Sequence, residues 1–336
     1  MHLRIFIILC IVQVTQATLR PSQVDAQHIH DWLEWKYKNN KNYDSAAEEL
    51  TRFYIWQENR QKIEEHNNQY VFGVTSHRLA INEFADISNE EFQARLSIPK
   101  PSNHKPLNTT VKVSNFLVVP SSIDWRNYGL VTRVKNQGSC GSCWAFSAVG
   151  SFEGQYYKTY KKLRTFSEQQ LIDCNTMDYG CEGGIQQRAF DDMLTNDRLK
   201  HLEDENDYPY REVKNHCRIS PQHGRHILRG YQSVDPDNET EMLWLTGLVG
   251  PVAASLDATG LDFQFYKDGV YKNRQCSPDK ISHGVVVIGY GTNAKDGDYW
   301  IVKNSWGPGW GEDGFFKIAR GSNMCGIARQ SSIAIL

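Results

Sequence analysis

Three features are scarce in this chain: long apolar runs, an excess of one charge, and closely spaced metal ligands. The apolar stretch at residues 5–12 is shorter than the ~20 residues of a membrane-spanning helix, and no later segment qualifies, so we expect no membrane span. The 37 basic and 39 acidic residues give a net charge of −2 without a basic stripe, which argues against nucleic-acid binding. The histidines that gather in the sequence lack tight ligand spacing, so we expect neither a metal nor another cofactor: His28, His30, His216, His223 and His226.

The N-terminus has the features of a secretory signal. Arg4 precedes the short apolar run, and the small residues Thr15 and Ala17 provide a cleavage site. We therefore predict a signal peptide over residues 1–17 and entry into the secretory pathway. The remaining length is enough for about two domains.

The character of the chain changes near residue 120. Residues 18–118 contain no cysteine, and apolar residues at helical spacing predict a long helix at about 46–70. Residues from about 120 to 230 favour helices, whereas later residues form short β-branched and aromatic runs at 284–290, 299–302 and 315–318. This order predicts a helical lobe packed on a β-barrel-like lobe, with a cleft between them.

Cys143 lies in the stretch QGSCGSCWAFS, residues 137–147, where a Gly-rich turn leads into an apolar segment with helical spacing. The pattern predicts that Cys143 stands at the start of a helix. A thiol becomes a strong nucleophile as a thiolate, which both a positive helix end and a neighbouring imidazolium favour. From this stretch alone, a buried or disulfide-bonded cysteine is the alternative.

Two later stretches supply candidate partners for this thiol. His283 opens an apolar, β-prone run, SHGVVVIGYG, and Asn304 closes another, YWIVKNSWG. Histidine suits proton transfer because its pKa lies near the working pH, and a neutral asparagine fixes its ring without adding charge. Taken alone, His283 is compatible with a core histidine and Asn304 with a turn residue.

Together these stretches resemble the papain family of cysteine proteases, most closely its cathepsin L-like branch. The resemblance covers nearly the whole chain and implies an α+β, papain-like fold of two lobes, with a helical inhibitory prodomain in front. It also implies domain limits of 18–118 for the prodomain and 119–336 for the peptidase. Two sets of prodomain residues match the branch: Glu48, Arg52, Trp56, Asn59, Ile63 and Asn67, then Ala80, Asn82, Phe84 and Asp86.

The resemblance assigns catalytic roles to the candidate residues. Cys143 is the nucleophile, and His283 stabilises its thiolate as an imidazolium and later protonates the leaving amine. Asn304 orients the ring of His283, and Trp306 shields that contact from water at the edge of the substrate cleft. The side chain of Gln137, with the backbone N–H of Cys143, forms the oxyanion hole.

Substrate contacts are implied in the same way. Gly183 and Gly184 border the strip where an extended substrate pairs through its backbone. The pocket for the second residue upstream of the scissile bond combines apolar and amide side chains: Ile185, Gln186, Ser255, Ile281, Gly284 and Gln330. Uncharged amides in this pocket predict a preference for aliphatic or aromatic residues over arginine. No insertion resembles those that obstruct the cleft in related exopeptidases, so we expect an endopeptidase.

The cysteine count fits an oxidising compartment. Of eight cysteines, Cys10 leaves with the signal peptide, and the remaining odd number leaves one thiol unpaired. The sequence alone does not choose among the pairings. The resemblance implies Cys140–Cys181, Cys174–Cys217 and Cys276–Cys325, with Cys143 free; each bridge stabilises by roughly 2–4 kcal/mol.

The expected partners are protein and peptide substrates, the chain's own prodomain as inhibitor, and cystatin-like inhibitors, with the enzyme a monomer. We expect acid pH to release the prodomain, in a lysosome-like acidic compartment or after secretion. Asn108 and Asn238 lie in N-glycosylation triplets. Two rival functions remain: a Cys-His acyl transferase or peptide ligase that uses the same thioester, and a secreted binding protein descended from a protease. The presence of all four catalytic residue types argues against the second.

Overall fold

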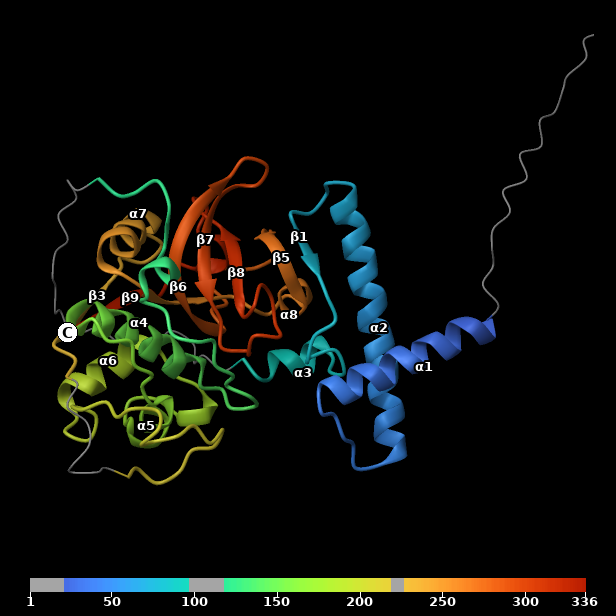
Figure 1. Ribbon diagram of the computed structural model, residues 1–336, viewed down its shortest axis with the longest axis horizontal. Coiled ribbons are helices and arrows are strands. Elements are labelled where there is room, and N and C mark those ends of the chain that lie inside the picture. Colours follow the sequence, from blue (N-terminus) through green and yellow to red (C-terminus); the bar gives the residue numbers. More distant parts are fainter. Residues whose placement is uncertain (1–20, 97–117, 219–226) are drawn as a thin grey trace, which may run out of the picture. The chain divides into compact units, whose positions relative to one another are not determined.

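The computed structural model describes residues 21–96, 118–218 and 227–336, and the chain divides into two compact units (Figure 1). The division falls between Gln57 and Glu58, inside helix α2 (Ala46–Val71). The long helix predicted at about 46–70 is therefore confirmed. The predicted signal peptide and Asn108 lie outside the described residues.

The first unit is a pair of helical segments with an aromatic core. It contains helix α1 (Pro21–Lys38) and the first part of α2. The indole rings of Trp32 and Trp35 stack with centroids 5.2 Å apart, and Trp56 of α2 packs edge-on against Trp32. All three indoles are buried. Aromatic burial of this kind supplies most of the packing energy available to so small a unit.

The second unit contains the remaining helices and all the strands of the described residues. Its helices and single turns are α3 (Asn89–Gln93), η1 (Trp125–Tyr128), α4 (Cys143–Tyr160), α5 (Glu168–Cys174), η2 (Gly180–Glu182), α6 (Gln186–Thr195), α7 (Glu239–Trp244), η3 (Leu245–Val249), α8 (Leu261–Gln264) and η4 (Met324–Gly326). Its strands are β1 (His77–Leu79), β2 (Ile123–Asp124), β3 (Gly230–Ser233), β4 (Val252–Leu256), β5 (Tyr266–Tyr271), β6 (His283–Asn293), β7 (Gly297–Lys303), β8 (Phe315–Ala319) and β9 (Ser332–Ile335).

The strands form one sheet in the order β1-β5-β8-β7-β6-β4-β9-β3, with β2 added to β6. Its pairs are antiparallel except β5 with β8. Strand β6 is central and buried on both faces, which explains why its sequence reads as a continuous apolar run instead of an alternating one. The three strands predicted from the β-prone runs correspond to β6, β7 and β8.

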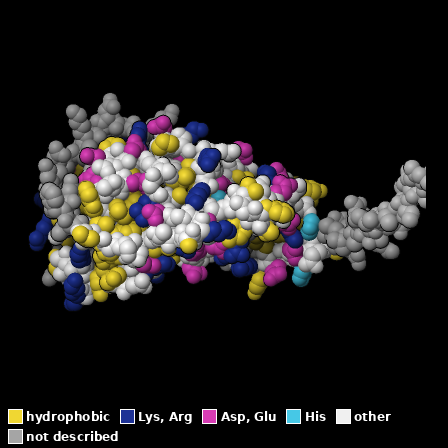
Figure 2. All heavy atoms as spheres, turned by 90° about the horizontal axis from the view of Figure 1, so that it is seen from above, with side chains coloured by type: hydrophobic (Ala, Val, Ile, Leu, Met, Phe, Trp, Pro, Cys, Tyr) yellow, Lys and Arg dark blue, Asp and Glu magenta, His cyan; other side chains and the backbone are white. Residues whose placement is uncertain are grey.

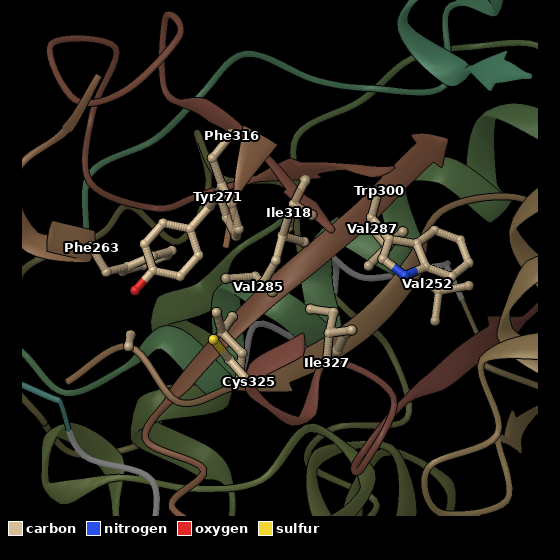
Figure 3. Packing of buried hydrophobic residues seen from close by; sticks show 14 of the residues in the cluster. Val252, Phe263, Tyr271, Val285, Val287, Trp300, Phe316, Ile318, Cys325 and Ile327 are labelled. Carbon is tan, nitrogen blue, oxygen red and sulfur yellow. The ribbon is translucent and has the colours of Figure 1, made fainter. Parts of the chain in front are cut away.

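The two largest hydrophobic cores of the described residues lie in two lobes. One lies on the sheet and includes Val285, Val287 and Trp300, which Figure 3 shows packed together. The other is built around α4 and includes Phe152 and Phe190. Figure 1 shows α4, α5 and α6 grouped on one side of strands β6 to β8. The predicted division into a helix-rich and a strand-rich part is confirmed.

Three disulfides fasten the second unit: Cys140–Cys181, Cys174–Cys217 and Cys276–Cys325. These are the pairs that the family resemblance implies. Cys143 is the free cysteine of the described residues, and it is buried. The oxidised pairs anchor loops next to functional elements, since Cys140 lies three residues before Cys143 and Cys276 precedes strand β6.

The surface and helix content agree with the composition. Figure 2 shows acidic and basic side chains interspersed over the face in view, in keeping with the small net charge. Among the helices of residues 21–96, 118–218 and 227–336, none is long and apolar enough to span a bilayer. Over the same ranges, no group of three His, Cys, Asp or Glu side chains is arranged to hold a metal ion.

Candidate active site

Cys143 is the first residue of helix α4, as predicted. Ser142 at the preceding position makes no side-chain cap, so the positive end of an 18-residue helix is not neutralised there. The turn before the helix is held by the Cys140–Cys181 disulfide and by a 2.9 Å bond from the N–H of Gly141 to the carbonyl of Cys181. The sulfur therefore stands at a fixed, electropositive place.

His283 reaches the same place from the sheet. It is the first residue of β6, and its neighbour Gly284 lies directly on Cys143: a Cβ at Gly284 would come within 2.9 Å of the Cys143 carbonyl oxygen. Only glycine permits so close an approach of strand and helix start. The backbone of Gly284 also forms a hydrogen bond to the Cys143 sulfur, which counters the rise in its pKa. The structure thus brings the predicted thiol and the predicted histidine segment together.

Asn304 holds the ring of His283 in one tautomer. Its side-chain oxygen lies 2.7 Å from Nε2 of His283 and accepts a second bond of 2.8 Å from the backbone N–H of Ser305. Because that backbone group can only donate, the atom facing it is the oxygen, and Nε2 of His283 must carry the hydrogen. Nδ1 is then left unprotonated in the neutral ring, buried and without a hydrogen-bond partner.

Trp306 covers this contact. Its indole stacks on the His283 ring with centroids 4.4 Å apart, and both side chains are buried. Exclusion of water from one side of the His283–Asn304 bond strengthens it, because the local dielectric is low. The predicted shielding role has a matching geometry.

Both ends of the Gln137 side-chain amide, and its backbone carbonyl, are hydrogen-bonded. Its Nε2 donates to the carbonyl of Cys140 over 3.0 Å, and its Oε1 accepts from Oγ of Ser305 over 2.7 Å. The backbone carbonyl accepts from the hydroxyl of Tyr210 over 2.7 Å. Since an amide NH₂ carries two hydrogens, one remains for a developing oxyanion. These hydrogen bonds fix which end of the amide is the donor.

Ser305 was not anticipated from the sequence, yet it joins the two halves of the site. Its N–H holds Asn304, its Oγ holds Gln137, and its carbonyl accepts the N–H of Gln137 over 2.8 Å. The signal was its place between the predicted Asn304 and Trp306. Buried polar groups need partners, and this serine supplies three.

Burial sets the charges of the site in this state. Burial raises the pKa of Cys143 to about 11, against the opposing effect of backbone hydrogen bonds. Burial also lowers the pKa of His283 to about 4, although the hydrogen bond that its ring donates to Asn304 acts in the opposite direction. The sequence led us to expect a thiolate and an imidazolium, whereas the buried groups of this full-length chain favour neutral forms. The difference has one physical cause, the loss of water around both.

Three of the predicted pocket residues are joined by the side chain of Gln186. Its Nε2 donates to the carbonyl of Gln330 over 2.5 Å, and its Oε1 accepts from Oγ of Ser255 over 3.0 Å. Ser255 is the register partner of Gly284, which ties it to the strand that carries His283. Ile185 and Ile281 are buried. The amide of Gln186 is thus committed to the protein, while Oε1 of Gln330 is buried without a partner.

The two glycines of the predicted backbone strip differ in what requires them. Gly183 has a φ of 116°, a conformation in which a side chain is strained. A Cβ at Gly184 would come within 2.6 Å of the Trp144 ring. Both positions therefore need glycine for the loop to reach its present course beside the start of α4.

Comparison with known sequences matches this arrangement to a family. The profile of the papain family cysteine proteases matches residues 119–335, about two thirds of the chain. The chain belongs to this family. A second profile, the cathepsin propeptide inhibitor domain, matches residues 32–92. The protein is thus a cathepsin L-like cysteine peptidase that carries its own inhibitory propeptide, with the papain-like fold.

Individual relatives and solved structures agree. A cathepsin L-like proteinase of Fasciola hepatica is 40% identical over 91% of this chain and 93% of its own length. Human cathepsin L2 is 40% identical over 90% of each chain. The structure of digestive procathepsin L 3 from the midgut of Tenebrio molitor larvae superposes with a TM-score of 0.84 at 36% identity, covering 92% of this chain and 99% of that one.

The propeptide of this peptidase docks through its second motif. Asn82 donates from Nδ2 to the carbonyl of Gln264 over 2.8 Å, and the backbone of Ala80 donates to Phe265 over 2.9 Å. Phe84 packs edge-on against Trp306, with ring centroids 5.6 Å apart. The propeptide therefore contacts the same indole that stacks on His283.

Proposed function

We propose that this peptidase is an endopeptidase that works through Cys143, His283, Asn304 and Gln137. The observation that carries the proposal is the His283–Asn304 contact of 2.7 Å beside an unbridged cysteine at a helix start. That arrangement leaves Nδ1 of His283 ready to take a proton from the thiol. The neutral pair of the buried state becomes an ion pair once water and substrate reach the site.

The reaction follows from these atoms. The thiolate of Cys143 attacks the scissile carbonyl carbon, and the carbonyl oxygen becomes an oxyanion that accepts from Nε2 of Gln137 and the N–H of Cys143. The imidazolium of His283 gives its Nδ1 proton to the leaving amine, and a thioester remains. Water then attacks the thioester, with His283 as base, and the carboxylic acid product leaves.

Three finer features belong to the same proposal. The precursor is a zymogen with a signal peptide over 1–17 and a prodomain over 18–118, removed at acid pH in a lysosome-like compartment or after secretion. The pocket beside Gln186 selects aliphatic or aromatic residues, because its amide is already hydrogen-bonded and carries no charge to attract arginine. Asn238, partly exposed at the start of α7, carries a glycan; the enzyme is a monomer open to cystatin-like inhibitors.

The test begins with the purified precursor incubated at about pH 7 and about pH 4.5, beside a Cys143→Ala control. We expect processing near Val118 or Val119 at acid pH alone, read by N-terminal sequencing, and none in the control. The processed enzyme is then assayed on fluorogenic dipeptides that vary the second upstream residue. Equal processing at both pH values, or a strong arginine preference, would contradict the proposal. Ligated products in the presence of added amine would favour the transferase alternative.

A further inference from the structure

We propose that His66 and His77 of the propeptide, facing Asp262 of the peptidase, form the acid-sensitive element that releases the propeptide. This inference rests on the proposed function, since it names the groups that sense acid in the zymogen. It assigns the response to acid to one site, where two histidines face a single carboxylate.

His77 is the buried half of the pair. It lies on β1, which adds to the edge strand β5 of the peptidase with His77 opposite Gly269. Its side chain is 1% exposed, and Nε2 lies 3.6 Å from Oδ2 of Asp262. Both ring nitrogens are without a hydrogen-bond partner. The ring is thus buried beside a carboxylate without a hydrogen bond to it, and its two polar nitrogens are left unsatisfied.

His66 stands against it from helix α2. The two imidazole rings lie 4.7 Å apart by their centroids, and Nε2 of His66 donates to the backbone carbonyl of His77 over 3.1 Å. His66 is half-buried, and burial followed by the nearby charge of His77 lowers its pKa, against the effects of that hydrogen bond and of Asp262. Docking of β1 thus brings together two groups that resist being charged at once.

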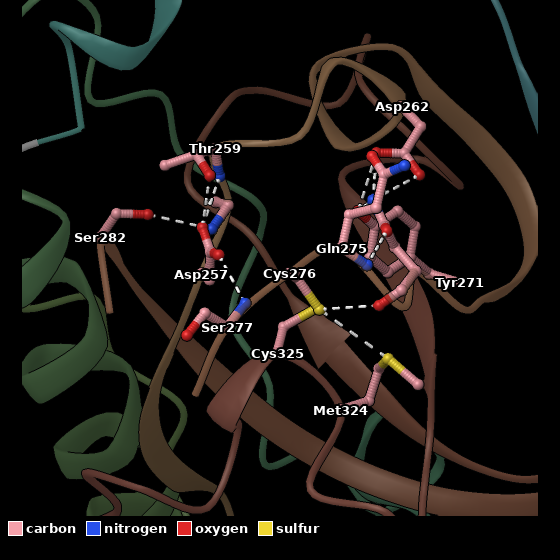
Figure 4. Close-up of a disulfide and its surroundings, with 12 residues drawn as sticks. Asp257, Thr259, Asp262, Tyr271, Gln275, Cys276, Ser277, Ser282, Met324 and Cys325 are labelled. Carbon is pink, nitrogen blue, oxygen red and sulfur yellow. Dashed lines mark hydrogen bonds between the residues drawn. A yellow bond between two sulfur atoms is a disulfide. The ribbon is translucent and has the colours of Figure 1, made fainter. Parts of the chain in front are cut away.

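The charges around the pair allow one proton and disfavour a second. Asp262 from α8 is the carboxylate that faces the rings, and it also accepts bonds from the Tyr271 hydroxyl and from Asn273, some of which Figure 4 shows. Tyr266 and Tyr271 of β5 contribute neutral rings. One imidazolium is balanced by Asp262, so a second would be an uncompensated buried charge.

The other ionisable groups nearby are engaged elsewhere. Arg78, between the inward residues of β1, points outward and donates from Nε to Asp268 over 2.8 Å. Lys62 on α2 pairs with Glu58 over 2.7 Å, one turn before His66. Neither supplies the missing negative charge, and Arg78 adds positive charge on the same strand.

The pKa of His66, lowered first by burial, sets the sign of the effect. A histidine whose pKa is lowered by docking binds more protons when undocked, so docking is strongest when the ring is neutral and weakens as pH falls through the free value of ~6.5. Release driven by His66 therefore begins about two pH units above the range in which ordinary carboxylates titrate.

The experiment uses the full-length precursor with Cys143→Ala, which prevents self-processing. Hydrogen exchange of the backbone amides of Leu79 and Ala80, which bond to Asn67 and Phe265, is measured from about pH 7.5 to about pH 4 and corrected for intrinsic rates. We expect protection to be lost with a midpoint near pH 6. His66→Gln keeps a donor for the His77 carbonyl and should lower the midpoint by about one pH unit. Asp262→Asn removes the counter-charge and should raise it.

The exposed His30 provides the matched control, and His30→Gln should leave the midpoint unchanged. A midpoint near pH 4 that does not respond to His66→Gln would overturn the proposal and point to carboxylates. If the propeptide of the His66→Gln variant is not docked at pH 7.5, His77→Phe is used in its place. Phenylalanine fills the same aromatic cluster and removes the charge beside His66, so it should also lower the midpoint. Peptidase activity of the acid-processed wild type is measured separately, so that loss of the proposed function and loss of this element give different results.

Discussion

Replacing Asn304 by alanine should lower kcat/KM by about 10- to 150-fold. The oxygen of Asn304 lies 2.7 Å from Nε2 of His283, and the asparagine is 3% exposed, so water does not replace the lost acceptor readily. A hydrogen bond to a charged group contributes about 1.5–3 kcal/mol, and 1.36 kcal/mol corresponds to a tenfold change in rate. The bond is strongest when the ring is an imidazolium, so its loss weakens the catalytic form selectively.

The pH profile distinguishes this account from a general loss of structure. The hydrogen bond to Asn304 raises the pKa of His283, so Asn304→Ala should move the alkaline limb of kcat/KM to lower pH. The assay is hydrolysis of a fluorogenic peptide by the processed enzyme between about pH 4 and pH 9. Asn206→Ala, at an exposed turn far from His283 in sequence, is the matched control and should leave both rate and profile unchanged. An Asn304→Ala enzyme with wild-type kcat/KM and an unmoved alkaline limb would refute the reasoning.

Three further predictions concern other buried polar groups. Gln137→Ala should lower kcat by about 10²–10³ with little change in KM, because one oxyanion donor is lost; steady-state kinetics on the processed enzyme would show a KM effect instead if Gln137 only bound substrate. Lys135→Met should destabilise the fold by about 3–5 kcal/mol, because Lys135 donates to the buried carboxylates of Glu168 over 2.7 Å and Glu153 over 3.2 Å. Urea unfolding measures this loss. An unchanged unfolding midpoint would show that these carboxylates need no cation. Burial raises the pKa of Asp178 to about 7, against the effects of its backbone hydrogen bond and of Arg188, so the folded chain holds a proton that the unfolded chain releases and loses up to about 4 kcal/mol of stability as pH rises from about 4 to 7. Asp178→Asn should flatten this dependence of the free energy of unfolding on pH. The same dependence in both proteins would show that another group causes it.

Much of the fold could be predicted because its elements carry strong local patterns. The long helix at 46–71 and the helix that begins at Cys143 have apolar residues at helical spacing, and β6 is a continuous apolar run because both its faces are buried. The edge pairing of β1 with β5 was not predictable in this way. A three-residue strand has too short a pattern, and its partner lies nearly two hundred residues further along the chain.

The proposed catalytic residues could be named from their motifs, whereas their state of charge could not. Sequence placed Cys143, His283 and Asn304 together, but their pKa values depend on how much water reaches them, which is a property of the packed chain. Ser305 escaped notice for a related reason. Its role depends on hydrogen bonds to its sequence neighbour Asn304 and to Gln137, which only the fold brings within reach.

Alkylation of the processed enzyme by an epoxide that reacts with active-site thiolates shows whether Cys143 is the nucleophile. We expect one adduct per molecule, located on Cys143 by mass spectrometry, with activity lost in the same proportion. We expect much slower labelling of the unprocessed chain at neutral pH, where burial keeps the thiol protonated. An adduct on another residue, or full activity after complete modification of Cys143, would contradict the proposed role of this thiol.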